Sequence, residues 1–339
     1  MDIGIAKENG LKNSERRAIL LPDEVKRLVE AGNQVFVEKG LGSGIYISDE
    51  NYKGAGAKIV AEQKNIFNKS IVVKLKPPLP EEFKLLKNNI LFSMLHAEQN
   101  PQYIQALKKT NSKAIAMELI RDNAGERPLQ CSDMCGEQGM IMAFHLAEKS
   151  PSDCNVLVLG YGDVASGALR VAFSLGDNVK IVRKKEYRYI KGLLCDKDIV
   201  INGIQWPKEK RQKKEYLITR DMLSLLNNGA IILDLSVDFP NPIEVCRPSL
   251  PNTPVYIVDG VSCISIYGYP KLVPVSSSMR YSKQALPILL EIASTPLDEL
   301  SKSIKDAIIN PVDFCFHSDV KGVAFKNIVK NKKLDLSKT

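Results

Sequence analysis

The sequence lacks the patterns that mark membrane proteins, metalloproteins and disulfide-stabilised domains. Its 339 residues contain no apolar run close to the roughly 18 residues that a transmembrane helix requires. The seven cysteines are scattered, and they form neither a CxxC pair nor a Cys/His spacing typical of zinc sites. The chain also has no internal repeat and no low-complexity segment. We therefore expect no membrane association, no bound metal and no disulfide framework.

The sequence has no dominant charge of one sign. Charged residues make up 25% of the chain, and the formal net charge of +8 is spread along it. The densest basic cluster, residues 208–214, lies in a predicted loop and is not accompanied by a nucleic-acid-binding motif. A solvated charged loop is the favoured interpretation, with an anionic ligand or nucleic acid as the alternative. We expect small-molecule substrates and no nucleic-acid partner.

The sequence shows no secretory signal. Met1 is followed directly by a strand-like segment, residues 3–6, rather than by an apolar leader. An odd number of scattered cysteines is typical of reduced thiols in a cytoplasm. We therefore expect a cytoplasmic protein.

The chain does contain a strand–turn–helix–strand pattern at residues 155–185. The apolar strand 156–159 leads into a glycine turn, a helical pattern follows to Leu175, and a second apolar strand covers 179–182. This pattern matches the dinucleotide-binding unit with its G-x-G-x-x-G/A fingerprint, in which a small third residue lets the helix pack closely. The free N–H groups at the start of the helix suit a pyrophosphate. The predicted cofactor-binding residues of the turn are Gly160, Gly162, Asp163, Val164 and Ala165.

The end of the second strand indicates which dinucleotide is bound. An NAD site would place an acidic residue there to accept hydrogen bonds from the ribose. This chain has Arg183, Lys184 and Lys185 instead. A guanidinium can hold a 2′-phosphate through two parallel bonds, each contributing about 1.5–3 kcal/mol. The sequence predicts NADP as the cofactor, with Arg183 and Lys184 at its phosphate, and a solvated basic turn is the alternative.

Strand and helix patterns alternate along the whole chain, which predicts an α/β fold with largely parallel sheets. The first sheet is expected from residues 3–6, 34–38, 71–76, 90–94 and 114–117. The second sheet is expected from 156–159, 179–182, 199–201, 230–235 and 255–258.

We predict two Rossmann-like domains with parallel sheets, joined by two long helices at 132–149 and 276–293. Residues 1–134 and 285–339 form the predicted substrate and catalytic domain, and residues 135–284 form the predicted NADP-binding domain. A cleft between the two domains is the expected place for a small-molecule site.

Four polar residues lie in loops after predicted strands, where ligands of open α/β sheets bind. They are Arg17, Lys76, His96 and Asp238. Arginine can clamp a carboxylate, lysine can polarise a carbonyl, and histidine can exchange a proton near neutral pH. Together these residue types suit reductive chemistry on a 2-oxo acid.

Each of the four residues also has a structural interpretation. Only three histidines are present, and a lone histidine is often structural. Lys76 can be an exposed strand end, and Arg17 can form a salt bridge with Glu15. Asp238, near Pro240, can be a turn residue. From these residues taken alone, both interpretations stay open.

Several motifs follow one another in a specific order: AKE…SERRAILLP, GLGSGIYISDENYKGAGAKIV, VVKLKPPLPEEF, ILFSMLH, the glycine turn and DLSVDFPNPIE. In this combination the chain resembles the alanine dehydrogenase / transhydrogenase N-terminal family over nearly its whole length. The resemblance implies that Arg17 and Lys76 bind the substrate. It further implies that His96 is the catalytic histidine and that Asp238 is the catalytic aspartate.

The chain departs from the alanine dehydrogenase pattern at several positions. Arg183 replaces the acidic ribose-binding residue, and Ala165 replaces the third glycine. SSSMRYSKQALP stands where the family has TSTFALTNATLP, which puts Lys283 in place of a substrate-site asparagine. These features, with RKKEYRYIKG and IVINGI, are similar to the carboxyethylornithine synthase branch of NADP-linked, opine-type dehydrogenases.

That similarity predicts an NADPH-dependent oxidoreductase that condenses pyruvate with the amine of ornithine or lysine and reduces the imine. Arg280 and Lys283 are then expected to bind the carboxylate of the amino acid, unless both point to solvent. An alanine dehydrogenase that uses ammonia is one alternative, and a catalytically silent NADP-binding sensor or subunit is another. The presence of all four candidate site residues argues against a silent protein. We also expect a homo-oligomer.

Overall fold

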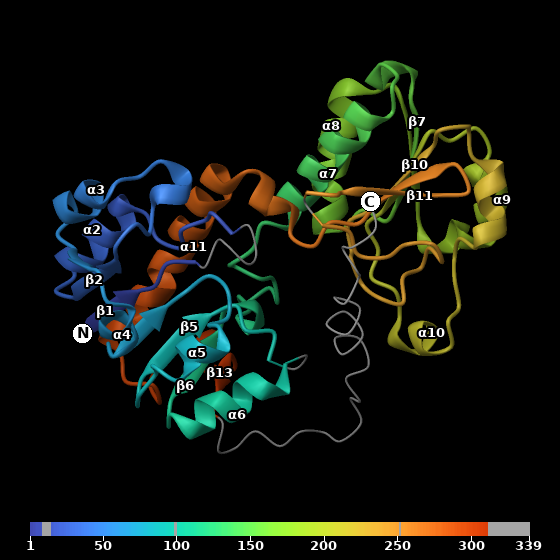
Figure 1. The fold of residues 1–339 in the computed structure, drawn as a ribbon. Coiled ribbons are helices and arrows are strands. Elements are labelled where there is room, and N and C mark those ends of the chain that lie inside the picture. Colours follow the sequence, from blue (N-terminus) through green and yellow to red (C-terminus); the bar gives the residue numbers. More distant parts are fainter. Residues whose placement is uncertain (9–14, 98–99, 251, 311–339) are drawn as a thin grey trace, which may run out of the picture. The chain divides into compact units, whose positions relative to one another are not determined.

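The computed structural model describes residues 1–8, 15–97, 100–250 and 252–310, and the chain divides into two compact units (Figure 1). Unit 1 contains Met1–Gln130 and the chain from Pro274 onward, and unit 2 contains Cys131–Val273. Each unit has its own sheet and its own hydrophobic core. The predicted domain boundaries, 134/135 and 284/285, lie inside two long helices and stay a prediction.

Unit 1 is built on a seven-stranded sheet in the order β13-β6-β5-β4-β1-β2-β3. The strands are β1 (Asp2–Ile5), β2 (Gln34–Glu38), β3 (Lys58–Val60), β4 (Ile71–Val73), β5 (Ile90–Ser93), β6 (Lys113–Ala116) and β13 (Ile308–Ile309). Neighbouring strands are parallel except for the antiparallel pair β13–β6. Runs such as Ile71–Val73 are buried throughout, as strands of a covered parallel sheet require.

Short helices connect the strands of unit 1, and one long helix returns the chain to it. The connecting helices are α2 (Pro22–Glu30), α3 (Asp49–Gly54), α4 (Gln63–Phe67), α5 (Pro80–Phe83), α6 (Pro101–Lys109), the short η2 (Met117–Leu119) and α12 (Lys302–Lys305). The long helix is α11 (Pro274–Ser294). Its Ser278 and Ser282 hydroxyls accept the backbone N–H groups of Ala18 and Leu21, at 3.0 and 2.7 Å. These two serines therefore fix the segment that follows Arg17.

Unit 2 is built on a six-stranded sheet in the order β11-β12-β10-β9-β7-β8. The strands are β7 (Asn155–Leu159), β8 (Asn178–Val182), β9 (Ile199–Asn202), β10 (Ile231–Asp234), β11 (Val255–Val258) and β12 (Val261–Ile264). Among these described strands, β11 alone runs antiparallel to its neighbour. Its helices are α7 (Ser132–Leu146), α8 (Asp163–Leu175), α9 (Ile190–Leu194) and α10 (Lys208–Gln212). The predicted pair of parallel α/β sheets is confirmed.

Two glycines let α7 and α8 touch backbone to backbone. A Cβ atom on Gly136 would lie 2.0 Å from the carbonyl oxygen of Val164, and one on Gly167 would lie 1.7 Å from that of Asp133. Real Cβ atoms do not come this close, so neither position accepts a side chain. The contact fixes the start of α8, which follows the glycine turn.

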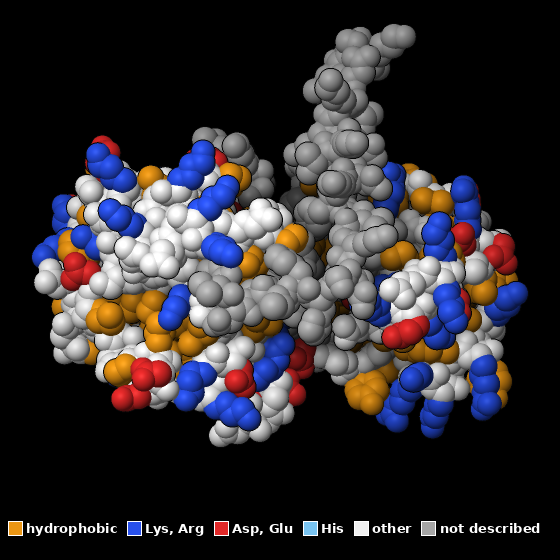
Figure 2. All heavy atoms as spheres, turned by 90° about the horizontal axis from the view of Figure 1, so that it is seen from below, with side chains coloured by type: hydrophobic (Ala, Val, Ile, Leu, Met, Phe, Trp, Pro, Cys, Tyr) orange, Lys and Arg blue, Asp and Glu red, His pale blue; other side chains and the backbone are white. Residues whose placement is uncertain are grey.

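The surface in Figure 2 carries interspersed basic and acidic side chains on both units. This agrees with a net charge of +8 that is spread along the sequence. Within the described ranges, no helix is long and apolar enough to cross a membrane.

Candidate dinucleotide pocket and catalytic side chains

The glycine turn of unit 2 has the geometry that its sequence predicts. Gly160 has a φ of +88°, and a Cβ there would lie 2.6 Å from the Ile204 side chain. Gly162 is the N-cap residue of α8 and has open space where a Cβ would be, so a ligand can approach its backbone. Ala165 packs on Gly203, whose Cβ would lie 2.8 Å from that of Ala165. The small third residue therefore belongs to a tight contact between helix and loop.

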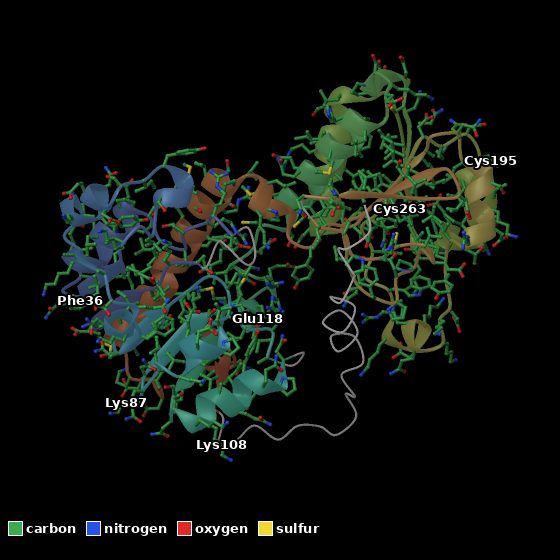
Figure 3. The ribbon with its side chains drawn as sticks, in the orientation of Figure 1. Phe36, Lys87, Lys108, Glu118, Cys195 and Cys263 are labelled. Carbon is green, nitrogen blue, oxygen red and sulfur yellow. The ribbon has the colours of Figure 1, made fainter. Side chains whose placement is uncertain are left out.

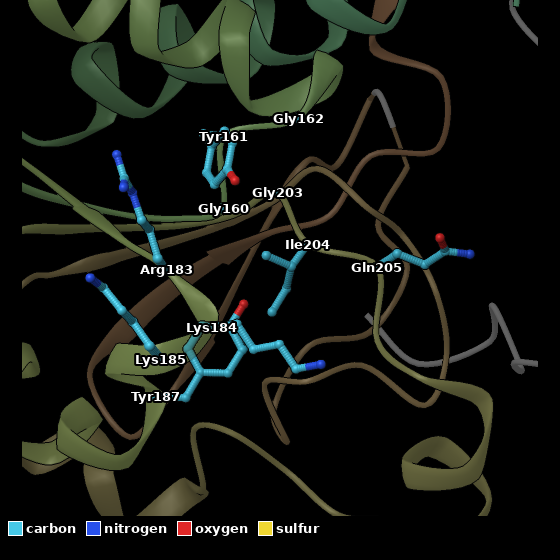
Figure 4. A pocket seen from close by; sticks show the side chains of 10 residues that line it. All are labelled: Gly160, Tyr161, Gly162, Arg183, Lys184, Lys185, Tyr187, Gly203, Ile204 and Gln205. Atoms are coloured by element: carbon cyan, nitrogen blue, oxygen red, sulfur yellow. The ribbon is translucent and has the colours of Figure 1, made fainter. Parts of the chain in front are cut away.

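A pocket of about 480 Å³ opens beside this turn (Figure 4). Its lining residues are Gly160, Tyr161, Gly162, Arg183, Lys184, Lys185, Tyr187, Gly203, Ile204 and Gln205. Among these described lining residues, three are cations and none is acidic. The volume lies within the usual range for small-molecule sites. The pocket therefore combines a backbone turn suited to a pyrophosphate with three basic side chains, which fits a dinucleotide.

The Arg183 side chain is exposed, and contacts with neighbouring residues support this position of the chain. Its guanidinium carbon lies 5.6 Å from the ring centroid of Tyr161, a cation–π contact across the pocket. Its backbone N–H donates to the Glu186 carboxylate at 2.9 Å, and Lys180 pairs with the same carboxylate at 3.2 Å. These contacts lower the pKa of Glu186, the backbone hydrogen bond contributing most. The Glu186 carboxylate is therefore bonded within the turn, and the charged side chains that line the pocket are all basic.

His96 follows β5 in unit 1 and has an unusual backbone conformation, with a φ of +48°. Its N–H donates to Glu118 at 2.6 Å, and its carbonyl accepts from the Asn100 amide at 2.9 Å. The imidazole is half-buried, and burial is the main cause that lowers its pKa. Lys76 and Arg127 lower this pKa further, whereas Glu118 raises it. The charged groups that act on the His96 imidazole are therefore two basic side chains and one acidic side chain.

Lys76 follows β4, beside a buried ionic cluster that the sequence did not reveal. The Lys74 ammonium, 1% exposed, donates to the Lys7 carbonyl at 2.8 Å and to Glu8 at 3.3 Å, and it lies 4.0 Å from Glu82. Glu8 also accepts the backbone N–H groups of Leu75 and Lys76, at 2.8 and 3.4 Å. This cluster fixes the backbone that carries Lys76. The three charged residues of the cluster lie in the segments AKE, VVKLK and LPEEF. These segments follow or flank predicted strands, and this shared position is the one sign of the cluster in the sequence.

Arg17 forms a salt bridge with Glu15, as its structural interpretation from the sequence expected. Its Nε and one terminal nitrogen each lie 2.6 Å from a different oxygen of Glu15. Both side chains are 3% exposed. The ring of Tyr281, on α11, lies 5.6 Å from the guanidinium carbon. The role of Arg17 in binding a substrate carboxylate stays a prediction.

Asp238 lies in the turn after β10 in unit 2. The buried Asp234 carboxylate organises this turn by accepting from Asn202 at 2.8 Å and from the Ser236 hydroxyl at 3.0 Å, and Val237 has a φ of +50°. Arg211, on α10, lies 3.9 Å from the Asp238 carboxylate. Burial raises the pKa of Asp238, and Arg211 opposes this shift. Asp238 therefore combines the turn position with a half-buried, ionisable carboxyl group.

Two arginines were missed by the sequence-based prediction. Arg127 acts on the charge of His96, and Arg211 pairs with Asp238. Each has a buried Nε without a hydrogen-bond partner among the described residues. Arg211 belongs to the basic cluster 208–214, which was predicted to be a loop, whereas residues 208–212 form α10. No local motif marks Arg127, because its position depends on the fold of the loop before α7.

Arg280 and Lys283 lie on α11, where they were predicted to meet an amino-acid substrate. Arg280 is half-buried and Lys283 is exposed, whereas the hydroxyls of Ser278 and Ser282 are buried and serve the fold. The substrate contacts of the two cations stay a prediction. Within the described part of the chain, no group of three or more His, Cys, Asp or Glu side chains could hold a metal ion.

Comparisons with known proteins agree with the two-unit architecture. Residues 4–135 match the family model "Alanine dehydrogenase/PNT, N-terminal domain", and residues 182–311 match "Alanine dehydrogenase/PNT, C-terminal domain". The alanine dehydrogenase of Staphylococcus haemolyticus (strain JCSC1435) is 28% identical over 96% of this chain and 95% of its own length. Alanine dehydrogenase 2 of Staphylococcus aureus (strain Mu50 / ATCC 700699) is also 28% identical, over 96% of each chain.

Solved structures show the same similarity. An L-alanine dehydrogenase superimposes with a TM-score of 0.81 at 25% identity, covering 91% of this chain and 94% of that one. A transhydrogenase from Sinorhizobium meliloti shares the fold, with a TM-score of 0.76 at 22% identity over 86% of this chain and 94% of its own. These relatives support the wider family and not the carboxyethylornithine synthase branch. The chain therefore matches the models of both the N-terminal and the C-terminal domain of alanine dehydrogenase/PNT, and its similarity to these proteins extends over nearly its whole length.

Proposed function

We propose that the protein is an NADPH-dependent dehydrogenase that reductively aminates a 2-oxo acid, with pyruvate and ammonia as its first candidate substrates. The observation that carries this proposal is the placing of Lys76 and His96. They follow the ends of the adjacent parallel strands β4 and β5, each by three positions. Lys76 also acts on the charge of His96. A cation and a proton-exchanging group therefore lie at the same edge of the sheet of unit 1. The relatives named alanine dehydrogenase support the choice of substrates.

The chemistry follows from the charges. The Lys76 ammonium holds the carboxylate or polarises the carbonyl oxygen of the 2-oxo acid. Because burial lowers the pKa of His96, its imidazole is neutral near pH 7 and can take a proton from the attacking amine. Two protons must pass from the nitrogen to the former carbonyl oxygen before that oxygen leaves as water. The same imidazole carries them in turn: the first forms the hydroxyl group of the carbinolamine, and the second releases water as the imine forms. A bound reduced nicotinamide supplies the hydride for the imine carbon.

The preference for NADPH is supported by the pocket beside the glycine turn. Arg183, Lys184 and Lys185 line it, and no acidic side chain is among the described lining residues. An NAD site needs a carboxylate for the ribose hydroxyls, whereas a 2′-phosphate needs cations.

Steady-state kinetics test the proposal directly. The oxidation of NADPH is followed with pyruvate and ammonia, and the assay is repeated with NADH. We expect turnover that requires both pyruvate and the amine, with a lower KM for NADPH than for NADH. A protein that binds NADPH but shows no amine-dependent turnover would instead be a cofactor-binding sensor or subunit.

A second candidate reaction uses an amino acid such as ornithine or lysine as the amine, as in carboxyethylornithine synthase. The observation that favours it lies within unit 1: two cations, Lys76 and Arg127, act on the charge of His96. Pyruvate carries a single carboxylate and ammonia carries none, so these cations exceed what that pair requires.

Amine competition separates the two candidates. If an amino acid is the amine, ornithine or lysine should have a kcat/KM far above that of ammonia. Arg280→Ala should then raise the KM for the amino acid and leave that for NADPH unchanged. A preparation that uses ammonia and ignores every diamino acid leaves alanine dehydrogenase as the activity.

A further inference from the structure

Glu118 is a buried carboxylate that belongs to none of the roles described above. It lies in η2, directly after β6, and is 8% exposed (Figure 3). Its two oxygens bind two consecutive backbone N–H groups. One accepts from His96 at 2.6 Å, and the other accepts from Leu95 at 3.0 Å. Successive N–H groups that converge in this way form a binding site for an anion, and here the anion is a side chain of the same unit.

The segment held by Glu118 is one that would not keep its conformation unaided. The φ of +48° at His96 is left-handed, which is unfavourable for a residue with a Cβ atom. Such conformations persist where surrounding contacts impose them. Glu118 holds the N–H side of His96, and Asn100 donates to its carbonyl at 2.9 Å. The direction in which the imidazole leaves the backbone is therefore set from both sides.

Glu118 also supplies the negative charge in the surroundings of the imidazole. The charged groups that act on His96 are Lys76 from the segment after β4, Arg127 from the loop before α7, and Glu118 from η2. Burial and the two cations lower the pKa of His96, and Glu118 is the group that opposes them. Without this carboxylate, the imidazole would face two cations alone.

We propose that Glu118 is a positioning residue for His96, whose carboxylate fixes the left-handed backbone of the histidine and supplies a negative charge close to its imidazole. The inference rests on the proposed catalytic role of His96. It adds a residue whose effect reaches the substrate only through another side chain. A purely structural carboxylate would hold the segment but would leave the proton affinity of the imidazole unchanged.

The decisive measurement is the titration of His96 in the substrate-free protein by ¹H–¹³C NMR. Only three histidines are present, and the His96 signal is identified by its absence in His96→Ala. Glu118→Gln keeps the side-chain shape but removes the charge and one of the two acceptor oxygens. We expect the pKa of His96 to fall by about one unit or more in this variant. Glu126→Gln, at an exposed site in the following loop, is the matched control and should leave the titration unchanged.

Kinetics give the second readout. In Glu118→Gln, the acidic limb of the pH profile of kcat/KM should move to lower pH together with the NMR titration. The kcat should fall by about tenfold or more, because the imidazole is no longer held in place. Glu118→Asp keeps the charge on a shorter side chain. It should restore most of the pKa while kcat stays low.

An unchanged His96 titration in Glu118→Gln overturns the proposal, whatever happens to the rate. If that variant does not fold, the titration is performed on Glu118→Asp, and a pKa of His96 far below that of the unaltered protein overturns the proposal. Because the NMR experiment needs no substrate, it is independent of the proposed function. Absence of amine-dependent turnover in the unaltered protein would refute that function and leave the contact between Glu118 and His96 measurable.

Discussion

The two units hold their predicted site residues in opposite ways. In unit 1, three buried carboxylates fix the candidates: Glu15 binds the guanidinium of Arg17, Glu8 binds the backbone at Lys76, and Glu118 binds the backbone at His96. In unit 2, the cations at the pocket are exposed, and Arg183 is supported by an aromatic ring and a hydrogen bond at the surface. Breaking a buried ionic contact costs several kcal/mol, whereas exposed contacts contribute little. The candidate residues of unit 1 are therefore held rigidly, whereas the exposed cations at the pocket of unit 2 can be changed at small cost to the fold.

The largest expected effect comes from the ionic cluster of unit 1. Lys74→Met removes the cation that the buried carboxylates of Glu8 and Glu82 share. The free energy of unfolding should fall by about 3–5 kcal/mol near neutral pH, the usual cost of leaving a buried charge unpaired. Urea unfolding followed by circular dichroism measures it. Lys53→Met, which breaks the exposed pair with Glu50, is the control and should leave the midpoint unchanged.

The loss in Lys74→Met should also depend on pH. Burial raises the pKa of Glu8, and Lys74 opposes this shift. Without Lys74, the folded-state pKa lies further above the value in the unfolded chain. Protonation then favours the folded state, and this stabilisation is lost as the pH rises through the folded-state pKa. We expect a smaller loss at pH 5 than at pH 8, and a loss independent of pH would mean that Glu8 does not titrate in the folded state.

The second effect concerns the proton-exchanging group of unit 1. His96→Ala should lower kcat by about a hundredfold or more, which is the usual contribution of general acid–base catalysis. The Kd for NADPH, measured by fluorescence titration, should stay the same, since the predicted cofactor residues lie in unit 2. His145→Ala, at an exposed position on α7, is the matched control. Near-normal turnover in His96→Ala would make His96 a structural residue.

A smaller effect is expected at the cofactor pocket. Arg183→Asp should raise the Kd for NADPH by about tenfold, equivalent to about 1.4 kcal/mol, and should favour NADH. Stability should not change, because Arg183 is exposed. Arg188→Asp, close by in the chain but absent from the pocket lining, controls for the change in net charge. Equal affinities of the unaltered protein for NADH and NADPH would remove the basis for the NADP assignment.

The smallest effect is expected at Tyr161, whose ring supports the Arg183 guanidinium. Tyr161→Leu should raise the Kd for NADPH about threefold, in line with about 0.5–1 kcal/mol for an exposed cation–π contact. Tyr161→Phe keeps the ring and should bind as the unaltered protein does. A loss of the same size in both variants would assign the effect to the hydroxyl group instead.

Features encoded by local patterns could be predicted from the sequence. The glycine turn needs only neighbouring residues, so the conformation of Gly160 and the nearness of Arg183 to the turn followed from their positions in the chain. Most strands of the parallel sheets were marked by apolar runs. The sequence-based prediction missed β3, β12 and β13. The two residues of β13 carry no periodicity, and the pairing of this strand with β6 depends on the rest of unit 1.

The supporting groups of the site could not be predicted in the same way. Lys74 looks like an ordinary strand-end lysine, and its burial depends on Glu8 and Glu82 from distant segments. Ser278 lies two positions before Arg280, a predicted substrate-binding residue, but its hydroxyl accepts the backbone N–H of Ala18. Each of these contacts joins residues far apart in the sequence, and neither partner carries a local signal of the other.

The contact between Ser278 and Ala18 also bears on the order in which the molecule can be completed during translation. The two residues are 260 positions apart. In the sequence, all of unit 2 lies between the two parts of unit 1. The ribosome therefore synthesises the whole of this contiguous Rossmann unit before it synthesises α11. Domains generally fold as units as they emerge. A nascent chain that ends before Pro274 can therefore contain a finished cofactor-binding unit, while the segment around Arg17 still waits for the helix that holds it.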